Sequence, residues 1–278
     1  MTNFVKNLKP LQKRCDRVPL LWRARLSVLT FFILFLTACT PLRPDLGPPV
    51  SSDFADALMQ AWIDEAAGIK SIRGLASLKL DAPLNKVNAN QVLLVEQPNR
   101  LRAETLSPFG VPLLLLVADG NKMGALLPAQ NLYYQGASSS ENLGMFVNLP
   151  LQLPDLVGVL LYQPRMIDAW EKEAFTLKNG GWLLIRRGTL QRQELVFNAM
   201  RQLVEVAYYE ENELFLKVHY AQFSASDNSY PKLLILDIPR KYAKVTLEFS
   251  DLETNAEIRP DLFNVVPPAS ARVVYLPD

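Results

Sequence analysis

The stretch Ser71-Ile-Arg-Gly-Leu-Ala-Ser-Leu-Lys-Leu80 changes the hydrophobic period of the chain from that of a helix to that of a strand. Its apolar and small residues share one face and its polar residues share the other: Ile72, Gly74, Ala76, Leu78 and Leu80 against Arg73, Ser77 and Lys79. This alternation predicts a half-buried strand.

The same pattern recurs along the chain, interrupted by short segments with the composition of turns. The runs span residues 87–96, 100–106, 113–117, 122–127, 132–135, 175–177, 182–187, 194–198, 203–209, 214–223, 232–239 and 241–249. Short strands joined by short turns predict an antiparallel meander rather than alternating β–α–β units. We therefore expect one large antiparallel sheet.

Two segments depart from the strand pattern. Residues 53–67 carry apolar side chains at helical spacing, and Ser51 or Ser52 can cap the start of this helix. Residues 138–170 contain a short turn and then an almost wholly apolar helix near residues 155–162. Such a helix must be covered on several sides or must itself cover an apolar space, so we expect helices on the concave face of the sheet.

A sheet of this many strands curls, and a curl that side chains fill incompletely leaves an apolar cavity. We expect eight residues to border it: Ile72, Leu78, Leu93, Val95 and Leu101 from the strands, and Leu156, Leu160 and Leu161 from the insertion. The alternative is a filled core built from the same residues, because alternation identifies the buried face but not what occupies it.

The first 38 residues have the composition of a secretory signal. Seven basic residues precede the apolar run 26–36, which is about half the roughly 20 residues that a membrane-spanning helix needs. The run leads into Leu36-Thr-Ala-Cys39, which resembles a bacterial lipobox. We expect the signal to be cut before Cys39 and several acyl chains to anchor that residue in a membrane. The alternative is an ordinary signal peptide followed by a chance cysteine.

Residues 39–50 hold four prolines and one glycine, which predict an extended tether without sheet hydrogen bonds. Residues 51–278 then form a single domain. The signal carries seven basic side chains and one acidic one, so its removal takes the formal net charge from +1 to −5. A mildly acidic chain without a basic stripe is not expected to bind nucleic acid.

The mature chain offers few groups for catalysis or metal binding. Cys15 leaves with the signal and Cys39 is acylated, so no disulfide is expected. His219 is the only histidine and lies in a strand-like run. A soft-metal site therefore lacks a ligand set, and neither a nucleophile elbow nor a phosphate-binding glycine-rich loop is found. We expect a protein without enzymatic activity, metal or cofactor.

Three segments carry a family resemblance in their order and spacing. They are Ser71-Ile-Arg-Gly-Leu-Ala-Ser-Leu78, Arg100-Leu-Arg-Ala-Glu-Thr-Leu-Ser-Pro-Phe-Gly-Val-Pro-Leu-Leu-Leu-Leu116 and Leu149-Pro-Leu-Gln-Leu-Pro-Asp-Leu-Val-Gly-Val-Leu-Leu161. Together with the predicted lipidated cysteine, they resemble the LolB family of outer-membrane lipoprotein receptors, within the LolA/LolB-like superfamily.

The resemblance implies an α+β fold that is mainly β: an unclosed antiparallel barrel of about eleven strands with a helical lid over an apolar cavity. It implies a receptor, anchored in the outer membrane and facing the periplasm, that holds the acyl chains of lipoproteins and inserts this cargo into the membrane. A LolA-like periplasmic carrier is the candidate donor. By motif, Phe109 matches an exposed apolar residue that assists delivery to the membrane. The alternative for Phe109 is packing against the neighbouring strand or the first helix.

Two other functions remain open. The first is a lipoprotein of the same fold that binds another lipid or serves as a subunit in envelope assembly. The second is a purely structural protein with a filled barrel. Bound acyl chains would separate the cavity-containing alternatives from the filled one.

Overall fold

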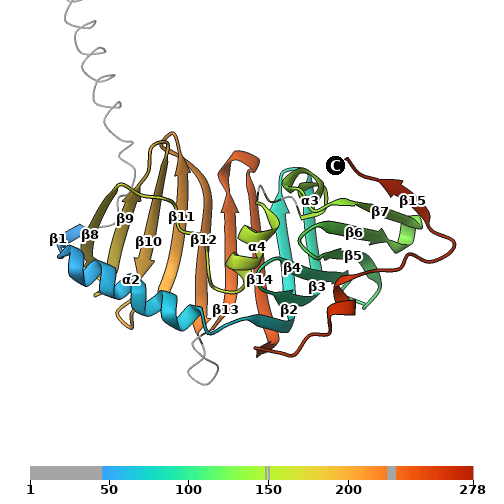
Figure 1. Cartoon of the computed structure of the whole chain (residues 1–278), viewed down its shortest axis with the longest axis horizontal. Coiled ribbons are helices and arrows are strands. Elements are labelled where there is room, and N and C mark those ends of the chain that lie inside the picture. The colour runs from blue at the N-terminus through green and yellow to red at the C-terminus, as the bar shows by residue number, and fades with distance from the viewer. Residues whose placement is uncertain (1–45, 148, 150, 224–229, 278) are drawn as a thin grey trace, which may run out of the picture. The chain divides into compact units, whose positions relative to one another are not determined.

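A single sheet organises the fold in the computed structural model, which describes residues 46–147, 149, 151–223 and 230–277. The predicted signal and Cys39 lie outside these residues. The sheet has the strand order β1-β8-β9-β10-β11-β12-β13-β14-β2-β3-β4-β5-β6-β7-β15 (Figure 1). Neighbouring strands are antiparallel except β7 and β15, which are parallel. Because β1 and β15 lie at the two ends of this order, the sheet stays unclosed, which confirms the predicted fold class.

The strands fall into two consecutive meanders. The first comprises β2 (Ser71–Ala82), β3 (Asn85–Glu96), β4 (Arg100–Leu106), β5 (Pro112–Ala118), β6 (Lys122–Leu127) and β7 (Leu132–Ala137). The second comprises β8 (Glu171–Leu177), β9 (Trp182–Arg187), β10 (Gln191–Phe197), β11 (Leu203–Glu210), β12 (Glu213–Phe223), β13 (Pro231–Ile238) and β14 (Ala243–Thr254). The two meanders join where β14 pairs with β2, from Lys244 opposite Asp81 to Thr254 opposite Ile72.

The helix α2 (Ser52–Ala66) lies across the second meander (Figure 1). It begins where expected, because the Ser51 side chain accepts a hydrogen bond from the backbone N–H of Phe54 at 3.3 Å. Trp62 is buried on its inner face and meets Phe197 of β10 in an edge-on ring contact, with centroids 6.3 Å apart. Burying an aromatic side chain of this size is a main source of attraction between the helix and the sheet.

The insertion between the meanders forms two short helices, α3 (Ser140–Val147) and α4 (Leu153–Leu160). Five of the eight residues of α4 are buried: Leu153, Leu156, Val157, Val159 and Leu160. The apolar helix predicted near residues 155–162 is therefore present, and it is covered on several sides. None of the helices in the described part of the chain is long and apolar enough to cross a bilayer.

The sequence does not predict the two edge strands, β1 (Leu46–Pro49) and β15 (Arg272–Tyr275). The expectation that residues 39–50 make no sheet hydrogen bonds is wrong for Leu46–Pro49, because β1 pairs with β8 and places Pro49 opposite Phe175. Proline is tolerated at a sheet edge, where its missing N–H need not serve a further strand. Added to the thirteen strand-like runs of the sequence, these two strands give the described sheet fifteen strands, more than the about eleven that the family resemblance implies.

An apolar cavity under the lid helices

Strands of both meanders and the lid helices α3 and α4 enclose an apolar cavity of about 280 Å³. It lies at the junction of the meanders, where Val245 and Leu247 of β14 face the same space as Leu78 and Leu80 of β2. Its other walls come from β3, β4, β5 and the lid: Asn85, Val87, Gln91, Leu93, Leu101, Ala103, Thr105, Leu113, Leu114, Leu116, Phe146, Val147, Leu149, Leu156 and Leu160. This volume is near the lower end of the roughly 300–1,000 Å³ typical of small-molecule pockets.

Five of the eight residues expected to border a cavity line this one: Leu78, Leu93, Leu101, Leu156 and Leu160. The other three, Ile72, Val95 and Leu161, are fully buried in the surrounding core and do not line it. Ile72 lies opposite Val95, near the start of β2. That end is covered by the α2–β2 connection, where the Gln163 amide donates to the Ala66 and Ile69 carbonyls at 2.5 and 2.7 Å. The inward face is thus filled at one end and hollow at the other.

Two buried tyrosines attach the lid helix α4 to the sheet. The Tyr220 hydroxyl donates to the Val159 carbonyl at 3.2 Å, and the Tyr230 hydroxyl donates to the Leu160 carbonyl. Both acceptors lie in the last turn of α4, beyond the regular hydrogen bonds of the helix, and the Val159 carbonyl also accepts from the backbone N–H of Tyr162 at 3.3 Å. Burial raises the pKa of both hydroxyls well above 10, so they remain neutral donors.

No sequence pattern identifies these two hydrogen bonds, from Tyr220 to Val159 and from Tyr230 to Leu160, which we call the latch. Tyr220 falls on the inward face of its strand, between Val218 and the start of the β12–β13 connection, as an ordinary core residue would. The only available signal is a polar hydroxyl at a buried position, which requires a partner. Which carbonyl supplies it depends on how α4 packs.

The turn between β4 and β5 carries Phe109 at its tip. The Ser107 N–H donates to the Val111 carbonyl at 2.8 Å, and the Ser107 hydroxyl accepts from the Val111 N–H at 3.0 Å, which closes the turn. Gly110 has a φ of +81°, a value that glycine adopts without strain. Phe109 is 94% exposed, so it does not pack against the neighbouring strand or the first helix.

This turn leads directly to the most exposed wall of the cavity. Leu113, at the start of β5, lines the cavity and is also 41% exposed. Asn85, at the start of β3, is the other exposed residue of the lining. Because neighbouring strands are antiparallel, the β2–β3 and β4–β5 turns lie at the same end of the strands. The exposed Leu84, in the β2–β3 turn, therefore lies at that end too. The cavity therefore approaches the surface beside exposed apolar side chains.

The cavity wall contains one polar pair, the buried Gln91 and the half-buried Thr105. Gln91 is only 5% exposed, and its side-chain oxygen accepts a hydrogen bond from the Thr105 hydroxyl at 2.9 Å. Its amide nitrogen reaches only the Val92 carbonyl, at 3.5 Å, which is the outer limit of a hydrogen bond. Gln91 shares the inward face of β3 with Leu93, so a polar residue at a buried strand position is a signal that the sequence does contain.

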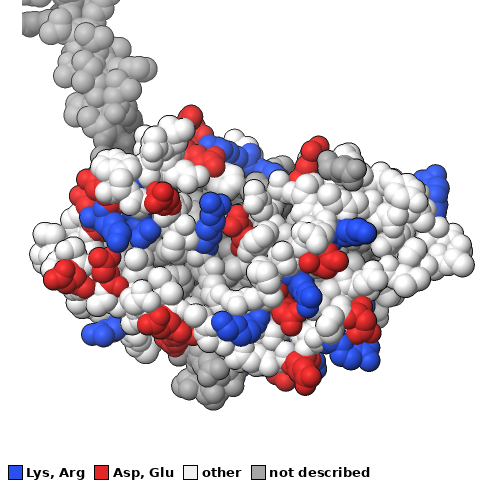
Figure 2. All heavy atoms as spheres, viewed as in Figure 1, with Lys and Arg blue, Asp and Glu red and all other residues white. Residues whose placement is uncertain are grey.

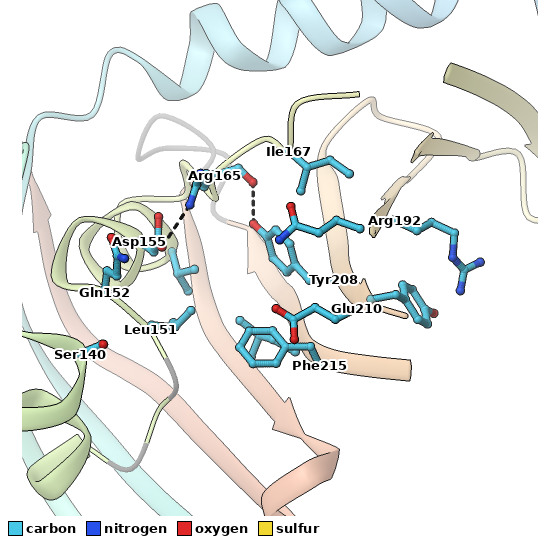
Figure 3. Close-up of a pocket in the computed structure, with 14 residues that line it drawn as sticks. Ser140, Leu151, Gln152, Asp155, Arg165, Ile167, Arg192, Tyr208, Glu210 and Phe215 are labelled. Carbon is cyan, nitrogen blue, oxygen red and sulfur yellow. Dashed lines mark hydrogen bonds and ion pairs between the residues drawn. The ribbon is translucent and has the colours of Figure 1, made fainter. Parts of the chain in front are cut away.

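A second pocket, of about 270 Å³, is lined by both charged and apolar side chains (Figure 3). Arg165 and Asp155 point toward each other across it, with 3.8 Å between their charged groups, and the Tyr208 hydroxyl donates to the Arg165 carbonyl at 2.8 Å. Arg192 is held by Glu194 at 2.5 Å. Because charged side chains line this pocket, it is less suited than the first to an apolar guest.

Charged and metal-ligating side chains of the described residues are the candidates for a second kind of site, and the face in Figure 2 shows no large patch of one charge. Basic and acidic side chains are interspersed over the face shown in Figure 2. His219 lies half-buried in β12, between Glu205 and Ile235 of the flanking strands. Within the described ranges no cluster of three metal-ligating residues occurs.

Comparisons with known proteins find relatives in structure only. No family model matches the chain, and no curated protein does. Among solved structures, a DUF1329 family protein from Desulfovibrio piger has 15% sequence identity and a TM-score of 0.50, covering 75% of this chain and 95% of its own. A domain from Vibrio parahaemolyticus, provisionally described as an outer membrane lipoprotein-sorting protein, has 14% identity and a TM-score of 0.49, covering 75% and 95%.

A LolA superfamily protein from Nitrosomonas europaea has 15% identity and a TM-score of 0.47, covering 74% of this chain and 97% of its own. At these identities the likeness to the Desulfovibrio piger protein concerns the fold alone. The chain thus shares its open, mainly antiparallel sheet with a solved structure of low sequence identity.

Proposed function

We propose that this protein is a lipid-anchored receptor of the outer membrane that holds the acyl chains of lipoproteins and passes this cargo into the bilayer. The observation that carries the proposal is an apolar cavity that approaches the surface beside the exposed Phe109 turn. An apolar guest gains free energy on leaving water, at about 0.8 kcal/mol per buried CH₂ group. The surrounding leucines and valines supply such an environment without catalytic chemistry.

The Phe109 turn supports a delivery step. Three exposed large apolar residues follow one another in this turn and at the start of β5: Phe109, Val111 and Leu113. Aqueous solubility does not favour such a cluster, whereas an apolar surface such as a bilayer does. Cargo leaving the cavity past Leu113 would meet the membrane where Phe109 enters it.

The lid supports an acceptance step. A space of about 280 Å³ is small for the several acyl chains of a lipoprotein, so loading requires displacement of α3 or α4. The latch from Tyr220 and Tyr230 to the last turn of α4 opposes this displacement. Anchoring through Cys39 would keep the receptor at the membrane to which it delivers, as its lipobox-like sequence suggests.

Depletion of the protein in its native bacterium tests the proposal. Lipoproteins that normally reach the outer membrane should accumulate in the periplasm or the inner membrane, and mass spectrometry of separated membranes would detect them. Restoring expression with Phe109→Glu should relieve the defect less well than restoring the native chain. If the distribution of lipoproteins between the membranes did not change after depletion, the proposed receptor function would be refuted.

The second candidate is a lipoprotein of the same fold that binds another lipid or acts in envelope assembly. The modest volume of the cavity favours it, since 280 Å³ suits one chain better than several. Co-purifying lipid without lipoprotein mislocalisation after depletion would support this candidate over the first.

A further inference from the structure

We propose that Gln91 and Thr105 form a polar site inside the apolar cavity that binds the carbonyl oxygen of an ester-linked acyl chain. The inference rests on the proposed function and deepens it, because it names the chemical group that the cavity recognises. Such a site would bind an acyl ester more tightly than a plain hydrocarbon chain of the same length.

The bonding of Gln91 differs from that of the other buried polar residues of the described chain. The Ser71 hydroxyl donates at 2.6 Å, Asn142 donates at 2.9 and 2.8 Å, and the Gln193 amide both donates at 2.9 Å and accepts at 3.2 Å. The Gln91 amide nitrogen has only the 3.5 Å contact to Val92, next to it in sequence. A buried amide N–H without a good acceptor costs about 1–3 kcal/mol, which a ligand acceptor would recover.

The amide nitrogen of Gln91 is a hydrogen-bond donor without a good acceptor. The Gln91 oxygen accepts from Thr105, and the amide N–H groups of Gln91 are the donors that this pair leaves without a good partner. A ligand group that accepts hydrogen bonds suits these donors, and an ester carbonyl meets this description.

The position of the pair suits the head of an acyl chain. Thr105 lies opposite Leu114 in the adjacent strand, and Leu113 beside it is part of the exposed wall. Thr105 is therefore one strand away from the opening at Leu113 and Gln91 is two strands away, which corresponds to about 5 and 10 Å. A carbonyl placed there leaves the polar end of the lipid near the opening, while the hydrocarbon fills the space around Leu93, Leu101 and Leu160.

Matched ester and ether lipids test the site. The mature chain with Cys39→Ala would be loaded with an apolar fluorescent dye, and the dye would be displaced by dipalmitoyl phosphatidylglycerol or by its dihexadecyl ether counterpart. Native Gln91 should favour the ester by about two- to tenfold, the effect of one net hydrogen bond. Gln91→Met keeps the length of the side chain and removes the donor, so it should bind both lipids equally.

Gln193→Met is the matched control, since Gln193 is equally buried but makes good hydrogen bonds outside the cavity. It should leave the ester preference unchanged and lower the unfolding midpoint more than Gln91→Met does, because Gln91→Met loses only the hydrogen bond from the half-buried Thr105. Equal binding of ester and ether by the native chain, or a preference that survives Gln91→Met, would overturn the inference and leave the proposed function standing. A Gln91→Met midpoint as low as that of Gln193→Met would also overturn it, by making the amide structural.

A tripalmitoylated lipopeptide serves as the third competitor and separates the two sources of an acyl ester. Stronger displacement by the lipopeptide than by the phospholipid supports lipoprotein cargo, and the reverse assigns the site to a glycerolipid. Displacement by none of the three lipids would reject the proposed function and the carbonyl site together.

Discussion

Replacement of Tyr230 by phenylalanine removes one atom from the contact that holds the lid helix. The Tyr230 hydroxyl is the side-chain donor to the Leu160 carbonyl, and both residues are buried. Phenylalanine keeps the ring, so the edge-on contact with Phe249 at 6.2 Å is retained. The substitution therefore tests the hydrogen bond rather than the packing.

The structure predicts unequal effects for the two latch tyrosines. After Tyr230→Phe the Leu160 carbonyl loses its tyrosine donor in a dry environment, at a cost of about 1–3 kcal/mol. After Tyr220→Phe the Val159 carbonyl keeps the backbone N–H of Tyr162 at 3.3 Å, so the loss should be about 0.5–1.5 kcal/mol. For a domain of this size these losses correspond to a fall in melting temperature of about 2–4 °C per kcal/mol.

The lid assay is hydrogen exchange of the α4 amides, measured together with urea unfolding. Tyr230→Phe should speed exchange in α4 more than in the strands and should quicken uptake of an acyl probe. Tyr133→Phe is the matched control, because the Tyr133 hydroxyl donates to the Val265 carbonyl at 3.1 Å, away from α4. If Tyr230→Phe and Tyr133→Phe gave the same exchange in α4, the latch would be refuted.

Three further predictions concern the turn, the buried hydroxyls and the anchor. Phe109→Glu should slow transfer of cargo into vesicles ten- to a hundredfold, because burying an aromatic side chain in the membrane is worth roughly 1.5–3 kcal/mol, and it should change the melting temperature little. The control Met200→Glu, in an exposed turn at the opposite end of the strands, should leave transfer unchanged. Burial raises the pKa of Tyr220 and Tyr230 above the ordinary value of 10, so the folded chain keeps protons that the unfolded chain loses. Stability should hold below about pH 10 and fall above it by up to about 1.4 kcal/mol per pH unit for each tyrosine, and urea unfolding across that range should show a shallower fall in Tyr230→Phe. Cys39→Ala should leave an unprocessed or soluble species, and mass spectrometry of the mature amino terminus would contradict the anchor if Cys39 were found unmodified.

Alternation of apolar and polar residues is enough to predict the antiparallel sheet, because each strand must bury one face. It does not predict β1, since the proline content of Leu46–Pro49 argues against a strand unless the segment is known to lie at an edge. Turn chemistry predicts that Phe109 is exposed, because Pro108 and Pro112 restrict the backbone around it and Gly110 permits the positive φ of a tight turn.

The cavity is harder to predict than the sheet. Leu78 and Ile72 occupy equivalent inward positions on β2, yet one lines the cavity and the other is packed. The difference comes from what covers each end of the strand, and that depends on helices distant in sequence. The Tyr230 latch depends on the same packing, so no local pattern identifies it.

The junction of β14 with β2 has a consequence for folding during synthesis. The first meander emerges before the second, and until β14 arrives the long strand β2 has an unpaired edge. Pairing between residues so far apart in sequence is slow, because the intervening chain must first be ordered. An unpaired apolar strand is also a template for association with other chains. Chains that end before Ala243 should therefore aggregate rather than fold into a smaller barrel. The last long strand, β14, covers the hydrogen-bonding edge of β2, which is synthesised near the beginning of the chain.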